Sequence, residues 1–183
     1  MRSMSRRLVA GLIALIAVGG VFAYGLSKQS DVSRIDTKNI TVPPPGFATY
    51  PAAPITGTSF DGKAFSLAEL QGKPVFVNFW GSWCAPCRRE APELRTFSRS
   101  LGGRAAFVGV AIDSPHSDAV AFARKAGWRY PIVGKRCCHL SERYGLVGMP
   151  TTIVIDGKGR VVDRLLGPQT AARLEAELRA LGA

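Results

Sequence analysis

Residues 75–87 read VFVNFWGSWCAPC. The apolar run Val75–Phe79 is short and rich in residues that favour β-structure, so it predicts a buried strand. Pro86 suits the first turn of a helix, where its missing N–H costs little. The two cysteines of this segment, Cys84 and Cys87, are therefore expected at the junction between a buried strand and the start of a helix.

A cysteine at the start of a helix has a defined chemical consequence. Unpaired backbone N–H groups and the positive end of the helix dipole stabilise a thiolate there, so the thiol pKa falls and the sulfur becomes a nucleophile. We therefore assign Cys84 as the attacking thiolate and Cys87, one helical turn further on, as the resolving thiol. Inert core cysteines and a zinc site are the alternatives. A zinc ribbon needs a second spaced pair, whereas Cys137 and Cys138 are adjacent.

The sequence on both sides of this segment predicts an α/β fold. The dipeptide Asp61-Gly62 predicts a tight turn that joins two strands of a hairpin, Thr58–Phe60 and Lys63–Phe65. Further strands are expected at Ala106–Ile112, Tyr130–Val133, Thr151–Ile155 and Arg160–Leu166, and helices at Leu67–Leu70, Ala85–Leu101, Ser117–Ala126, His139–Tyr144 and Thr170–Leu181. Strands that alternate with helices and end in a hairpin indicate a sandwich of helices around a mixed sheet.

The N-terminal part predicts the compartment in which the protein works. Residues 8–26 carry no charge, and as a helix they would span about 28 Å, close to the roughly 30 Å of bilayer hydrocarbon. Residues 1–7 contain three arginines, which the positive-inside rule keeps in the cytoplasm. We therefore expect a single-pass anchor in the inner (cytoplasmic) membrane, with the rest of the chain on the extracytoplasmic, periplasmic side. A signal peptide cleaved near Ala23 is the alternative.

A linker and one folded domain are expected after this segment. Residues 27–50 are polar and then Pro-rich, which is typical of a flexible tether. Residues 51–183 are expected to fold as one domain, and they contain 18 basic and 11 acidic residues. The basic excess is spread out, with no like-charge run longer than a pair. That distribution is typical of a solvated surface, so we expect no nucleic-acid partner.

Two segments of the chain resemble motifs of thioredoxin-like proteins. Residues 78–92, NFWGSWCAPCRREAP, resemble the active-site segment, most closely that of the membrane-anchored TlpA/ResA branch. Residues 148–152, GMPTT, resemble the cis-proline loop of the same fold. The resemblance extends over residues 58–181. It implies a thioredoxin-like sandwich with an N-terminal hairpin and an insert between the strand at Ala106–Ile112 and the helix at His139–Tyr144.

The resemblance also implies which residues meet the substrate. Pro150 would form a cis peptide bond and face the cysteine pair. Met149 would present its backbone to an extended substrate segment, as in β-strand addition. Trp83 would shield one side of the disulfide, and Trp83 and Pro86 would both contact the substrate.

Glu90 stands where the TlpA/ResA branch has an active-site acid. It follows Cys87 by three residues, so a partly buried carboxylate there would accept the Cys87 proton during exchange. A surface glutamate paired with an arginine is the alternative. Thioredoxin itself has a buried aspartate in the preceding strand, and this sequence has Asn78 there, which cannot accept a proton at neutral pH.

The activity implied by the resemblance is thiol–disulfide exchange on Cys-containing protein substrates. No organic cofactor is expected, because the disulfide itself carries two electrons. The resemblance favours a monomeric reductant that keeps the cysteines of apocytochrome c or of copper-site proteins reduced, with electrons from a membrane electron-donor protein. The alternatives are a disulfide-forming oxidant, a copper metallochaperone with thiol ligands, and a non-catalytic adaptor, which would need an inert Cys84.

A second group, Cys137, Cys138 and His139, lies outside the resembling motifs. Three interpretations stay open. The two cysteines are local structural thiols or a vicinal disulfide, or they form a redox relay to Cys84 and Cys87, or they bind Cu(I) together with His139. No other metal site is expected.

Overall fold

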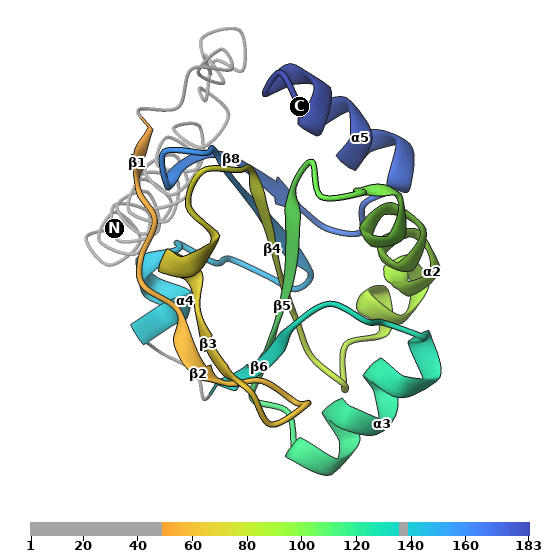
Figure 1. Ribbon diagram of the computed structural model, residues 1–183. Coiled ribbons are helices and arrows are strands. Elements are labelled where there is room, and N and C mark those ends of the chain that lie inside the picture. Colours follow the sequence, from red (N-terminus) through yellow and green to blue (C-terminus); the bar gives the residue numbers. More distant parts are fainter. Residues whose placement is uncertain (1–48, 136–138) are drawn as a thin grey trace, which may run out of the picture. The chain divides into compact units, whose positions relative to one another are not determined.

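The computed structural model describes residues 49–135 and 139–183, with the side chains of residues 135 and 139 left out of the description. The described chain forms a six-stranded sheet of order β1-β8-β7-β4-β5-β6 and a separate two-stranded hairpin, β2-β3 (Figure 1). The strands are β1 (Tyr50–Pro51), β2 (Thr56–Thr58), β3 (Ala64–Ser66), β4 (Val75–Trp80), β5 (Ala106–Ile112), β6 (Ile132–Lys135), β7 (Thr151–Ile155) and β8 (Arg160–Leu166). The helices are the 3-10 helix η2 (Leu67–Leu70), α2 (Ala85–Ser100), α3 (His116–Ala126), α4 (His139–Arg143) and α5 (Ala171–Ala180).

The sheet is mixed, as predicted. Strands β4, β5 and β6 run parallel, while β7 lies antiparallel to β4 and β8 antiparallel to β7. Every residue of β4 is buried. A continuous apolar strand suits this central position, because both faces of the sheet are covered.

Two apolar clusters cover the two faces of the sheet. Helices α2, α3 and α5 pack on one face, where Phe76, Trp80, Leu94, Phe97 and Leu174 are fully or almost fully buried. The hairpin, η2 and α4 cover the other face, where Val77, Phe79, Val110, Ile153 and Tyr144 are fully or almost fully buried. The alternation along β4 assigns Phe76, Asn78 and Trp80 to the α2 side, which places a polar side chain beneath the helix that begins at the cysteine pair.

The predicted elements are confirmed with small shifts at their ends. The predicted two-residue turn at Asp61-Gly62 is wrong. A five-residue loop, residues 59–63, joins the two strands instead, because the backbone N–H of Ser59 donates to Lys63 O and that of Gly62 donates to Ser59 O. Strand β6 begins at Ile132, after Pro131, which has no backbone N–H to donate. Tyr50 pairs with Val161 at the sheet edge, so the first strand of the described residues includes the last residue of the predicted linker.

Part of the sequence prediction lies outside the described residues. Residues 1–48, which include the predicted anchor, belong to this part, as do Cys137 and Cys138. Within residues 49–135 and 139–183, no helix is both long enough and apolar enough to cross a bilayer. The anchor and the role of the second cysteine pair therefore stay predictions.

Candidate active site

Cys84 and Cys87 form a disulfide at the start of α2. Their Cα atoms lie 5.3 Å apart. Cys84 is the N-cap residue, and its Sγ accepts a hydrogen bond from the backbone N–H of Cys87, with 3.2 Å between the heavy atoms. Pro86 occupies the first turn of the helix. The Cys84 sulfur therefore lies at the positive end of the helix, where a thiolate is stabilised.

The two cysteines differ in how near they lie to the surface. Cys87 is completely buried, and Cys84 retains 3% of its surface. Trp83, the residue before Cys84, is 55% exposed. Its indole lies against Gly81, because a Cβ atom on that glycine would come within 2.6 Å of the indole Cε2. Cys84 and Trp83 are therefore more exposed than Cys87.

The loop before β7 leaves the sheet at the same end as the cysteine segment. Thr151 pairs with Phe79 of β4, so the residues before Thr151 lie beside the residues after Phe79. The peptide bond between Met149 and Pro150 is cis. Two hydrogen bonds hold this loop: Thr151 Oγ1 donates to Gly148 O at 2.7 Å, and the Gly167 N–H donates to Pro150 O at 2.9 Å.

Glu90 is buried under the start of α2, with 2% of its surface exposed. Asn78 Nδ2 donates to its Oε1 at 3.1 Å, and the backbone N–H of Gln169 donates to its Oε2 at 3.1 Å. Burial raises the pKa of Glu90 to about 7, against the opposing effect of these two hydrogen bonds. Among the described residues, no basic side chain forms an ion pair with it, so the alternative of a surface glutamate paired with arginine is wrong.

Helical periodicity explains why Glu90 lies beneath the disulfide. The buried residues of α2 recur every three or four positions and form the stripe that faces the sheet: Cys87, Glu90, Ala91, Leu94 and Phe97. Glu90 takes the place in this stripe that directly follows Cys87. A carboxyl group with a pKa near neutrality, one turn below a buried thiol, suits a proton acceptor.

Glu90 has two hydrogen-bonding partners, Asn78 and Gln169, and the motif pattern alone assigned neither of them to the site. Asn78 Nδ2 also donates to Thr152 Oγ1 at 3.1 Å, so the amide joins α2 to β7. Asn78 had a signal in the sequence, since it is the single polar residue in the buried run of β4. Gln169 had no such signal in the sequence, because it contributes a backbone N–H, which any residue except proline could supply.

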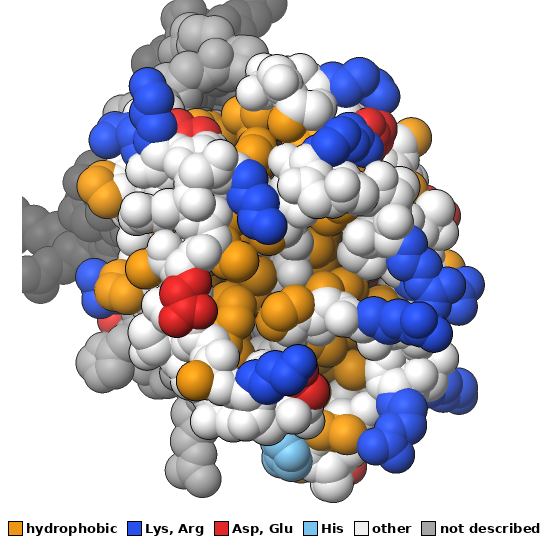
Figure 2. Space-filling view, viewed as in Figure 1, with side chains coloured by type: hydrophobic (Ala, Val, Ile, Leu, Met, Phe, Trp, Pro, Cys, Tyr) orange, Lys and Arg blue, Asp and Glu red, His pale blue; other side chains and the backbone are white. Residues whose placement is uncertain are grey.

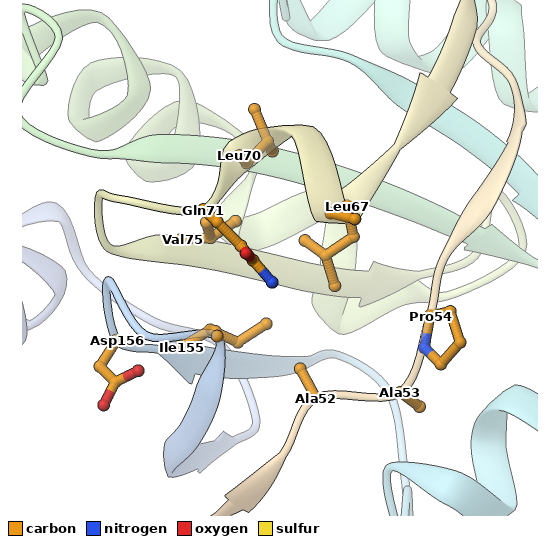
Figure 3. Close-up of a pocket in the computed structure, with 11 residues that line it drawn as sticks. Ala52, Ala53, Pro54, Leu67, Leu70, Gln71, Val75, Ile155 and Asp156 are labelled. Carbon is orange, nitrogen blue, oxygen red and sulfur yellow. The ribbon is translucent and has the colours of Figure 1, made fainter.

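The apolar cavity at the other end of the sheet does not extend this site. An apolar cavity of about 170 Å³ lies between β4, β7 and η2, and its lining includes Leu67, Val75 and Ile155 (Figure 3). Val75 begins β4 and Ile155 ends β7, so the cavity lies at the sheet end opposite the disulfide. Within the described part of the chain, no three His, Cys, Asp or Glu residues gather as metal ligands.

Comparisons with known proteins agree with this geometry. Residues 49–164 match the AhpC/TSA family. "Thiol-disulfide oxidoreductase ResA" of Bacillus thuringiensis (strain Al Hakam) is 32% identical over 124 residues, 67% of this chain and 71% of the relative. The crystal structure of a DsbF homologue from Corynebacterium diphtheriae superposes with a TM-score of 0.67 at 31% identity, covering 73% of this chain and 88% of that one.

A third relative is described as a secreted Mycobacterium tuberculosis disulfide oxidoreductase homologous to E. coli DsbE. It has a TM-score of 0.63 at 25% identity and covers 69% of this chain and 96% of that one. The predicted thioredoxin-like fold is therefore confirmed, together with the resemblance of the two motif segments to thioredoxin-like proteins. The chain belongs to the AhpC/TSA family and is a thioredoxin-like thiol–disulfide oxidoreductase of the ResA type.

Proposed function

We propose that this enzyme is an extracytoplasmic reductant, tethered to the inner membrane by residues 8–26, that reduces disulfides in protein substrates. Its clients would be apocytochrome c or copper-site proteins, and a membrane protein would return electrons to it. The observation that carries the chemistry is the disulfide at the start of α2 above a buried carboxyl group, Glu90, whose pKa is about 7. The extracytoplasmic setting is supported by the uncharged run of residues 8–26 and by a relative described as secreted.

The proposed exchange proceeds in two steps that conserve electrons and protons. The Cys84 thiolate attacks one sulfur of a client disulfide, the client S–S bond breaks, and a mixed disulfide forms while the other client sulfur leaves as a thiolate. Cys87 then gives its proton to the Glu90 carboxylate and attacks Cys84 Sγ. This second step releases the second client thiolate and closes the Cys84–Cys87 disulfide. Two electrons pass from the enzyme dithiol to the client.

The direction of electron flow is tested by the reduction potential of the Cys84–Cys87 pair. We expect a value at or below about −250 mV, in the thioredoxin range, because a reductant must give electrons away readily. The measurement uses the full chain in detergent, equilibrated in thiol buffers, with Cys137 and Cys138 replaced by Ser. A value near about −120 mV, typical of strong oxidants, would replace the reductant with the disulfide-forming alternative.

We also propose that Trp83 contacts the client, and Gly81 offers a test of this role. In Gly81→Ala the new Cβ would lie 2.6 Å from the Trp83 ring, so the exposed indole must move. We expect the KM for a disulfide-bonded model peptide to rise about three- to tenfold, with the potential unchanged. Gly134→Ala is the control, because its Cβ would meet only Phe60 at 3.5 Å. Equal KM values in both variants would remove Trp83 from the substrate site.

A further inference from the structure

Three buried polar atoms on the α2 side of the sheet have no hydrogen-bonding partner among the described residues. They are the indole Nε1 of Trp80, the hydroxyl of Tyr130 and the side-chain oxygen Oδ1 of Asn78. Such atoms are rare, because a buried polar group without a partner is costly. Asn78 is the residue whose amide nitrogen holds Glu90. One of the three unpartnered atoms therefore belongs to a residue that holds the Glu90 carboxyl group.

Gly109 is the strand residue beside which the Trp80 indole nitrogen and the Tyr130 ring both lie, next to Asn78. This residue of β5 pairs with Asn78 across the sheet. A Cβ atom built on it would lie 3.2 Å from Trp80 Nε1 and 3.2 Å from Tyr130 Cε2. The absence of a side chain at Gly109 thus lets the indole nitrogen and the tyrosine ring approach the strand directly beside Asn78.

Tyr130 connects this buried region to the surface. Its ring packs between Phe107 and Trp128, with centroid distances of 4.6 and 5.3 Å. The hydroxyl is buried, but Tyr130 is among the residues that line a groove of about 710 Å³ between the hairpin β2-β3 and α3. Apolar side chains are visible in the region between these elements, with Lys and Arg side chains over α2 and α3 (Figure 2). Tyr130 thus lines a groove at the surface while its hydroxyl lies in the interior, where the charge of Glu90 contributes, after burial, to raising the pKa of this hydroxyl.

The hydrogen-bonding capacities of the three atoms match a single water molecule. Trp80 Nε1 only donates, Asn78 Oδ1 only accepts, and the Tyr130 hydroxyl does either. A buried water in a protein typically makes about three hydrogen bonds to groups that otherwise lack partners. A water that donates to Asn78 Oδ1 also fixes the amide orientation, so that Nδ2 points to Glu90.

We propose that Tyr130 is a positioning residue for Glu90: its hydroxyl, Trp80 Nε1 and Asn78 Oδ1 hold one buried water, and this water orients the Asn78 amide that donates to the Glu90 carboxylate. The proposal rests on the proposed role of Glu90 as the proton acceptor of Cys87. Without the Tyr130 hydroxyl, the orientation of the Asn78 amide is less well fixed. The hydrogen bond from Asn78 to Glu90, which favours the charged form of the carboxyl group, is then weaker.

Few groups face Glu90, so a change in its titration midpoint can be traced to one of them. They are Asn78 from β4, the backbone N–H of Gln169 before α5, Cys87 on its own helix, and Tyr130 before β6. The helices α3 and α5 turn apolar side chains towards this cluster, among them Ala119, Ala123 and Leu174. Glu93, the next carboxyl group along α2, accepts a hydrogen bond from the Ala171 N–H instead.

The test follows the Glu90 carboxyl by ¹³C NMR in the full chain, in detergent and in the disulfide form, with Glu90→Gln to assign the signal. We expect Tyr130→Phe to raise the titration midpoint of Glu90 by about half a unit to one unit, the size of a weakened hydrogen bond to a charged group. Tyr144→Phe is the matched control. It also removes a buried hydroxyl, one that donates to Ala53 O at 2.6 Å in the other core, and it should leave the midpoint unchanged.

Three results would overturn the proposal. The first is an unmoved Glu90 midpoint in Tyr130→Phe, and the second is the same shift in Tyr144→Phe. The third is a high-resolution crystal structure without a water between Trp80 Nε1, Tyr130 and Asn78, a test that needs no variant to fold. A Glu90 midpoint near the ordinary 4.5 in the unsubstituted chain would instead refute the proposed role of Glu90, so the two failures are distinguishable.

Discussion

Replacing Cys84 with Ser lowers thiol–disulfide exchange by at least about a thousandfold, because the chain loses its attacking sulfur and a serine hydroxyl is not ionised at neutral pH. The structure supports this assignment, since Cys84 is the helix N-cap with a backbone N–H directed at its Sγ, and it stands beside the exposed Trp83. The measurement is the rate at which the reduced chain reduces a disulfide-bonded model peptide.

Substitution of Cys87 separates the attack on the client disulfide from the resolution of the mixed disulfide. Cys87→Ser keeps the nucleophile but cannot release the client, so we expect a stable mixed disulfide through Cys84, seen by mass spectrometry under non-reducing conditions. The comparison is Cys137→Ser with Cys138→Ser, which leaves the two site cysteines intact: an unchanged rate would assign the exchange to Cys84 and Cys87 alone, and a lowered rate would support the redox relay. A mixed disulfide that formed through Cys87 in Cys84→Ser, at the rate of the unsubstituted chain, would reverse the two roles.

The fold was predictable from the sequence because its central elements carry strong local signals. The run at Val75–Trp80, the helix after Cys84 and the hairpin of β7 and β8 each combine a clear hydrophobic pattern with turn residues at their ends. Boundaries shifted where a tertiary contact decides them. Tyr50 belongs to a strand because it pairs with Val161 of β8, and the residues near Tyr50 carry no pattern that predicts this pairing.

The site was predictable only where a motif places its residues. Cys84, Cys87, Glu90 and Pro150 belong to two short segments, and spacing along one helix already brings the first three to one face. The environment of Glu90 was not predictable to the same extent. Gln169 acts through its backbone, and Tyr130 reaches the site because Gly109 leaves room on a neighbouring strand. Contacts of this kind depend on sheet register, which a single sequence does not specify.

Replacing Glu90 with Gln slows the resolving step by about a hundredfold and removes the inflection near pH 7 from the rate profile, because an amide cannot take the Cys87 proton. The rate of mixed-disulfide resolution between pH 5 and 9 measures this. Glu93→Gln is the control. Glu93 lies one turn further along α2, and its carboxyl group accepts a hydrogen bond from the Ala171 N–H, so this substitution also replaces a carboxyl group by an amide. Identical profiles for the two variants would exclude Glu90 as the proton acceptor.

The same substitution has a second consequence, for stability. The pKa of Glu90 is raised from 4.5 to about 7 in the folded chain, so between these pH values the folded state binds more protons than the unfolded state. The free energy of unfolding therefore falls as the pH rises through this window, by a total on the order of 3 kcal/mol, and levels off above it. Glu90→Gln lacks this loss, so its urea midpoint should change less than that of the unsubstituted chain between pH 5 and pH 8. Parallel pH dependences would mean that Glu90 ionises in the folded chain as readily as it does in water, and burial would then not tune the acid of this active site.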